Sequence, residues 1–146
     1  MNEEHIPPLL SVDQMPAIRS QDDLHRHWRA LMGPLGFSGR QLWLNVLGGD
    51  RRPTPTLLQV DEVPEVPEPP LLDGLMAVIE ELLEDEPDGS VAVLLARPGS
   101  APMTHADREF AQALLDAATR TGVPLEPVHL ATDEEVRVFA PDDLAA

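Results

Sequence analysis

The sequence predicts an α/β (α+β) domain with a mixed β-sheet of about five strands flanked by helices. Residues 90–96 form a continuous apolar run, Ser-Val-Ala-Val-Leu-Leu-Ala, of the length and Val/Leu content typical of a buried central strand. Amphipathic segments of helix length lie on both sides of that run, and turns rich in Pro and Gly separate them from it. Helices that alternate with a buried strand in this way favour a sheet covered by helices.

Length and composition indicate one domain of ordinary size. The chain has 146 residues, of which 42% are hydrophobic, enough to bury a core. It has no Cys, so disulfides and thiolate metal sites are excluded. It shows no signal-peptide pattern and no apolar run long enough to cross a bilayer, so we expect a cytoplasmic protein without a membrane partner.

The formal charge of -16 argues against nucleic acids and anionic membranes as partners. The charge is unevenly placed. Up to Arg52 six acids balance six arginines, whereas the rest of the chain has twenty acids and four arginines. Two interpretations remain open for this acidic half: a solvated surface that confers solubility, or a docking face for a basic protein partner.

Residues 1–19 are predicted to be an N-terminal tail, partly ordered at most, ahead of a single domain over residues 20–146. The tail holds three prolines and no sustained hydrophobic period. We expect it to dock in part through Leu9, Leu10 and Ile18.

A first helix is predicted to begin after Ser20, a favoured N-cap residue, and to end at Gly33. His25 and His27 are two positions apart on this helix, so their side chains diverge and cannot share a metal ion. Together with Arg26 and Arg29, they predict a basic, solvated face.

Two antiparallel strands are predicted over residues 41–47 and 56–60. The first alternates, so that Leu42, Leu44 and Val46 point to one face of the sheet. The acidic, proline-rich residues 60–70 follow. They favour an extended connector, and a ligand for a proline-reading domain is the alternative.

A second helix is predicted over residues 71–84. It ends in a cluster of acids, where the negative end of the helix dipole disfavours them. Either the helix frays at this end, or the acidic cluster serves to bind a partner. The candidate partner face consists of Glu80, Glu84, Asp85 and Glu86.

A third helix is predicted to follow the loop after the central strand. Thr104 and Asp107 have the spacing of a capping box, and Gly122 is the residue type usual just past a helix end. Two short strands, over residues 125–131 and 136–139, and a frayed polar end complete the predicted order. Pro124 and Pro127 indicate that the first of these strands is an edge strand or begins late.

The stretch from about residue 41 to residue 139 resembles the JAB/MPN domain, especially its bacterial RadC-like branch. In that branch the central strand ends in His-Asn-His-Pro-Ser-Gly, Ser-x-x-Asp opens the next helix, and Gly-Ile-Pro-Leu follows that helix. Here Val-Ala-Val-Leu-Leu-Ala-Arg-Pro-Gly-Ser matches the strand and loop. Thr-His-Ala-Asp at 104–107 matches Ser-x-x-Asp, and Gly-Val-Pro-Leu at 122–125 matches the last segment. The resemblance implies a JAB/MPN (cytidine-deaminase-like) architecture.

The same resemblance implies that the metal motif is degenerate. Catalytic members of the family hold zinc with two His and the Asp, and an upstream Glu acts as the general base. In this chain the two His positions fall on Leu95 and Arg97, or on Leu94 and Ala96 in the other register. Only Asp107 is retained, so no catalytic residue, metal ligand or cofactor is expected.

The candidate ligand or vestigial site is made of four residues: Arg97, Thr104, His105 and Asp107. Asp107 has a structural explanation as a capping residue, and His105 is expected to be an exposed first-turn residue. Arg97 is expected either to pair with Asp107 or to bind an anion.

Three functions follow as expectations. The leading one is a non-catalytic JAB/MPN-like domain that acts as a protein-binding or adaptor module. The second is a metal-dependent hydrolase with relocated ligands, for which His105, Asp107 and His129 are the candidates. The third is a small-anion-binding domain that uses Arg97 and the N-terminus of the helix after Thr104.

Overall fold

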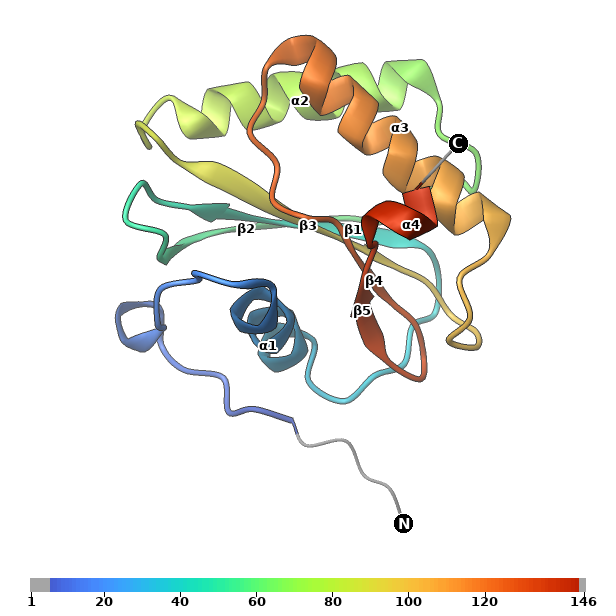
Figure 1. Ribbon diagram of the computed structural model, residues 1–146, viewed down its shortest axis with the longest axis horizontal. Helices are drawn as coiled ribbons and strands as arrows, with labels where there is room; N and C mark the ends of the chain where they lie inside the picture. The colour runs from blue at the N-terminus through green and yellow to red at the C-terminus, as the bar shows by residue number, and fades with distance from the viewer. Residues whose placement is uncertain (1–5, 145–146) are drawn as a thin grey trace.

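The computed structural model describes residues 6–144 (Figure 1). The first part of the expected tail, residues 1–5, lies outside the described residues. The elements in chain order are the 3₁₀ helix η1 (Val12–Gln14), α1 (Gln21–Met32), β1 (Gln41–Leu47), β2 (Pro53–Val60), α2 (Pro69–Leu83), β3 (Ser90–Ala96), α3 (His105–Thr121), β4 (His129–Ala131), β5 (Val136–Val138) and α4 (Pro141–Leu144).

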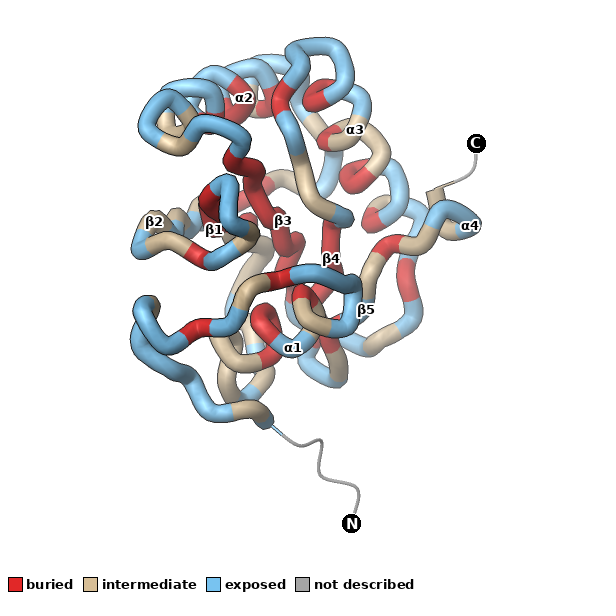
Figure 2. Tube along the Cα trace, turned by 60° about the vertical axis from the view of Figure 1, so that its left-hand side comes forward, coloured by how far each residue is buried: buried red, intermediate tan, exposed pale blue. Residues whose placement is uncertain are grey.

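The five strands form one mixed sheet in the order β2-β1-β3-β4-β5. β1 is antiparallel to both β2 and β3, β3 and β4 are parallel, and β4 and β5 are antiparallel. β3 is the middle strand, and each of its seven residues is buried (Figure 2). The predicted α+β class with a five-stranded mixed sheet is therefore confirmed, and so is the central place of residues 90–96.

Helices cover both faces of the sheet (Figure 1). α2 and α3 pack on one face, where the side chains at alternate β1 positions Leu42, Leu44 and Val46 join their core cluster. α1 packs on the other face, where Leu94 and Trp28 belong to a second core cluster. The alternation predicted for β1 is confirmed, because successive side chains of a strand point to opposite faces.

The predicted ends of α1 are confirmed, but its basic face is solvated only in part: Arg26 is exposed and His25 is half-buried. Ser20 caps the helix by accepting from the Asp23 amide, and the helix ends at Gly33. His27 and Arg29 are buried. His27 lies one turn after the core residue Leu24, so its side chain faces the sheet. The spacing of charged residues along the sequence does not predict this burial.

The segment before α1 lies against the domain through part of its length. Ile18 is 2% exposed and its amide donates to the Arg51 carbonyl, whereas Leu9 and Leu10 are 60% and 40% exposed. The guanidinium of Arg52 also donates to backbone carbonyls of this segment. Docking therefore uses Ile18 and leaves the two leucines largely open.

The predicted boundaries of α3 are confirmed, and so is a late start of the strand predicted over residues 125–131. Thr104 and Asp107 form the capping box, and Gly122 ends the helix with φ of 76°. Leu125 makes only an isolated bridge to Val91, and β4 begins at His129, after a proline that cannot donate to the ladder. The polar end predicted to fray forms the short helix α4 over residues 141–144.

None of the helices in residues 6–144 has the length and apolar composition needed to span a membrane.

Candidate functional site

The candidate site lies where β3 ends, at the first turn of α3. Residue 97 follows β3, and in the alternation of the strand it shares the face of Leu95, which packs on the α2–α3 side. β1 begins beside this point, because Gln41 pairs with Ala96. A cleft of about 490 Å³ opens here, lined by Arg40, Glu65, Val66, Arg97, Thr104, His105, Ala106 and Glu109.

Arg97 forms a salt bridge with Asp107, one of the two outcomes that the sequence left open. Its Nε donates to Oδ1 and Oδ2 of Asp107 at 2.9 and 3.0 Å, and its Nη2 donates to Oδ2 at 2.8 Å. Nη1 and Nη2 also donate to the carbonyls of Pro98, Ser100 and Pro102. All five N–H groups of the guanidinium therefore have partners within the protein. Arg97 fixes the loop and has no donor left for a ligand.

Asp107 is fully buried and has more partners than a capping residue needs. Besides Arg97, it accepts from the backbone amide of Thr104 at 2.9 Å, and its own amide donates to the Thr104 hydroxyl at 3.1 Å. Burial alone would raise the pKa of the Asp107 carboxyl, but the hydrogen bonds from Arg97 and Thr104 lower it below its usual range. The carboxylate is therefore ionised and fully engaged at neutral pH.

A second arginine, Arg40, lies at the same place and was not among the residues that sequence reasoning selected. Its Nη1 is 4.0 Å from Oδ1 of Asp107, and its guanidinium carbon is 5.8 Å from the centre of the Phe110 ring. Its Nε and Nη2 are buried and have no hydrogen-bond partner among the described residues. The register of β1 on β3 brings it here, and sequence spacing does not reveal that register.

His105 is exposed at the start of α3, as the sequence predicts. Its side chain is 84% exposed, and Nε2 lies 2.8 Å from Oε1 of Glu109, one turn further along the helix. His105 lines the mouth of the cleft. Within residues 6–144, its recorded side-chain partner is Glu109 and not the buried Asp107.

His129 lies on the other face of the sheet from α3. It pairs with Leu94, whose side chain packs on the α1 side. Its ring is fully buried, 6.4 Å from the ring of His25, with Nδ1 3.0 Å from the Pro127 carbonyl and Nε2 without a partner in the described part of the chain. The structure therefore does not bring together the relocated ligand set of His105, Asp107 and His129.

Acidification should destabilise the protein through His129. Burial, in part offset by the Pro127 carbonyl and reinforced by His25, lowers the pKa of His129 to about 4. Between pH 6.5 and 4, His129 is protonated in the unfolded chain but stays neutral in the folded chain. The free energy of unfolding therefore falls as the pH falls, by up to about 3 kcal/mol from this group. Urea unfolding at several pH values measures it.

The matched variants are His129→Gln and His105→Gln. The first should flatten the pH dependence between pH 6.5 and 4, and the second, at an exposed position, should leave it unchanged. Equal slopes for wild type and His129→Gln would show that the pKa of His129 is the same in the folded and the unfolded chain.

The acids of the predicted partner face lie at the end of α2. The helix ends at Leu83, so Glu84 and Asp85 follow its last turn and are exposed, as is Glu80 within it. Glu86 is half-buried in the turn that leads to β3, where its carbonyl accepts from the Gly89 amide. The side chains of Glu80, Glu84 and Asp85 are therefore accessible to solvent or to a partner, whereas Glu86 belongs to the turn before β3.

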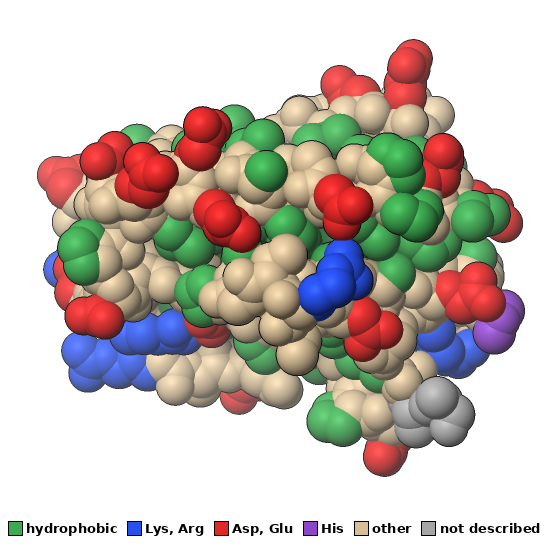
Figure 3. Space-filling view, turned by 90° about the horizontal axis from the view of Figure 1, so that it is seen from above, with side chains coloured by type: hydrophobic (Ala, Val, Ile, Leu, Met, Phe, Trp, Pro, Cys, Tyr) green, Lys and Arg blue, Asp and Glu red, His purple; other side chains and the backbone are tan. Residues whose placement is uncertain are grey.

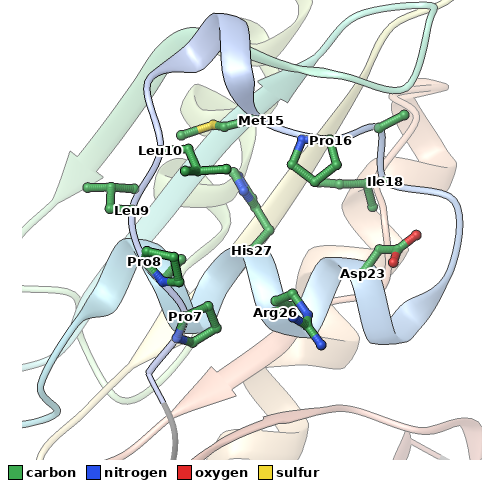
Figure 4. Close-up of a pocket in the computed structure, with 12 residues that line it drawn as sticks. Pro7, Pro8, Leu9, Leu10, Met15, Pro16, Ile18, Asp23, Arg26 and His27 are labelled. Carbon is green, nitrogen blue, oxygen red and sulfur yellow. The ribbon is translucent and has the colours of Figure 1, made fainter.

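A second cavity of about 230 Å³ lies between the segment before α1 and α1 itself (Figure 4). Pro7, Pro8, Leu9 and Leu10 form one wall, and the His27 ring reaches from α1 toward Leu10. His27 Nε2 lies 2.7 Å from Oδ1 of Asn45, an amide whose nitrogen donates to two carbonyls of β2. Nε2 is therefore the donor, and burial lowers the pKa of this neutral His27.

Groups of three or more His, Cys, Asp or Glu side chains placed to hold a metal ion do not occur among residues 6–144. No protein-family model matches this chain, and no curated protein matches it either.

Proposed function

We propose that this chain is a non-catalytic JAB/MPN-like domain, similar to the RadC-like branch, that acts by binding another protein. From α1 to β5 the order of elements, α-β-β-α-β-α-β-β, agrees with the order on which the resemblance rests, and η1 and α4 lie outside it. The five-stranded mixed sheet, with helices on both faces, supports the same assignment.

The observation that carries the proposal is the salt bridge between Arg97 and Asp107. In one register of the resemblance, Arg97 stands where a metal-binding His would stand. Its guanidinium engages both oxygens of Asp107, the one ligand retained. A cation at this position repels a divalent metal, and an occupied carboxylate cannot ligate one without losing the salt bridge. The hydrolytic centre is thus replaced by an internal ion pair.

The acidic half of the chain is the proposed docking surface. From Pro53 to Ala96 the sequence has eleven acids and no Arg, Lys or His. Figure 3, which looks onto the α2–α3 side, shows acidic side chains spread over that face, with hydrophobic side chains between them. Such a face favours a partner with a basic surface, because complementary charge accelerates association and selects the partner.

Replacing Glu84, Asp85 and Glu86 by Gln should leave the isolated domain equally or more stable. Acids beyond the C-terminal end of a helix oppose its dipole, each by about 0.3–1 kcal/mol. The same triple variant should capture less of a salt-sensitive partner than wild type does. The measurements are urea unfolding and capture on immobilised protein at low and high salt, read by mass spectrometry.

The control is a triple variant at exposed acids elsewhere, Asp13, Asp22 and Asp142 to Asn, which makes the same change in net charge. It should capture the partner as wild type does. A clear loss of stability in the Gln variant would make the acids structural, and equal capture by all three proteins would remove this face as the docking surface.

A further inference from the structure

The cluster at the end of β3 carries one more positive charge than negative. Within residues 6–144, Asp107 is the only carboxylate that lies within 4.0 Å of the Arg97 and Arg40 guanidinium groups. The side chains of the three residues are 0%, 10% and 16% exposed, so solvent screens the excess charge poorly. A buried cation without a full partner is costly, and an incoming anion would offset that cost.

Nη1 is the nitrogen of the Arg40 guanidinium that is left for such an anion, because Nε and Nη2 are buried. Arg97 has all its donors engaged, whereas no hydrogen bond of the Arg40 guanidinium is found within residues 6–144. Arg40 lines the cleft together with Thr104, which caps the 17-residue helix α3. The N-terminal end of that helix adds to the positive potential at the inner end of the cleft.

The mouth of the cleft has the opposite charge. Glu65 is exposed there, and Glu109 has a side chain that is 55% exposed. A simple anion would meet these carboxylates on its way in. A ligand with a carboxylate at one end and a positive group at the other is complementary in charge to both the inner end and the mouth of the cleft.

We propose that the cleft binds a small amino-carboxylate, with its carboxylate on Arg40 and its ammonium group near Glu65. This site does not depend on the acidic face around α2, and either proposal can fail without the other. The binding is a simple association, with no covalent step.

The probe is 6-aminohexanoate, compared with hexanoate and hexylamine, which each lack one of the two charges. NMR titration of the ¹⁵N-labelled full chain reads both affinity and location. We expect 6-aminohexanoate to bind with a Kd of about 1–10 mM and to shift amides at the start of α3, and each single-charge probe to bind at least about fivefold more weakly.

Two variants locate the two ends of the ligand. Arg40→Gln should weaken 6-aminohexanoate binding at least about tenfold. Glu65→Gln, an exposed and conservative change that keeps the fold, should weaken 6-aminohexanoate but leave hexanoate unchanged. Arg120→Gln, at an exposed arginine on α3, is the matched control and should have no effect. Absence of binding at about 50 mM 6-aminohexanoate would overturn the proposal. So would equal binding by wild type and Glu65→Gln, or shifts confined to amides away from the cleft.

Discussion

Replacing Asp107 by Ala should lower the free energy of unfolding by about 3–5 kcal/mol, because it leaves the buried Arg97 guanidinium without its counter-ion. From the sequence alone Asp107 is a capping residue, and its loss would cost roughly 0.5–2 kcal/mol. The structure predicts a larger loss of stability, because Asp107 is fully buried and accepts three hydrogen bonds from Arg97 as well as one from Thr104. Urea unfolding at pH 7 measures the change.

Thr104→Ala is the matched control, because it removes the cap hydroxyl and keeps the ion pair. Its expected cost is about 1 kcal/mol. Arg97→Met with Asp107→Ala completes a double-mutant cycle, and the double variant should be more stable than the sum of the single losses predicts. If Asp107→Ala costs no more than Thr104→Ala, the buried ion pair is not a major source of stability.

Replacing Leu94 by Ala should lower the free energy of unfolding by about 2–5 kcal/mol. Leu94 is fully buried in the middle strand, between Trp43 on β1 and His129 on β4, and it packs in the cluster on the α1 side. Removing three carbons from such a position loses transfer free energy and leaves a cavity.

Leu57→Ala is the control, at a position on the edge strand β2 that is 38% exposed. It should cost less than half as much as Leu94→Ala when both are followed by urea unfolding. A change within about 0.5 kcal/mol for Leu94→Ala would be incompatible with a close-packed core around β3.

Local patterns were sufficient to predict most of the fold. The apolar run at 90–96, the cap at Ser20 and the capping box at Thr104 and Asp107 each depend on neighbouring residues, and the structure has all of them. The late start of β4 also has a local cause in Pro127, which cannot donate a hydrogen bond. The salt bridge from Arg97 joins residues near the ends of consecutive elements, so the position of Arg97 at the end of the strand was enough to suggest it, with anion binding as the alternative.

The missed features all depend on contacts between distant segments. Arg40 lies near Asp107 only because β1 pairs with β3. The two residues are 67 positions apart in the sequence, and no motif next to Arg40 indicates that it belongs to the site. His27 finds Asn45 across the interface between α1 and β1, and His25 comes within 6.4 Å of the ring of His129. Helical spacing described His25 and His27 correctly as divergent, but it could not tell which partners α1 would meet on the sheet.

The metal content of the protein most directly tests the proposal that an ion pair stands in place of a hydrolytic metal centre. The protein is produced in zinc-supplemented medium, purified without chelators and measured by elemental analysis, beside Asp107→Ala. A catalytic zinc takes three protein ligands and an open position for water, and the end of β3 offers one carboxylate that Arg97 already holds. We expect no stoichiometric zinc in either protein and no hydrolysis of peptide or isopeptide bonds. About one zinc per chain in the wild type, lost together with a hydrolytic activity in Asp107→Ala, would contradict this proposal.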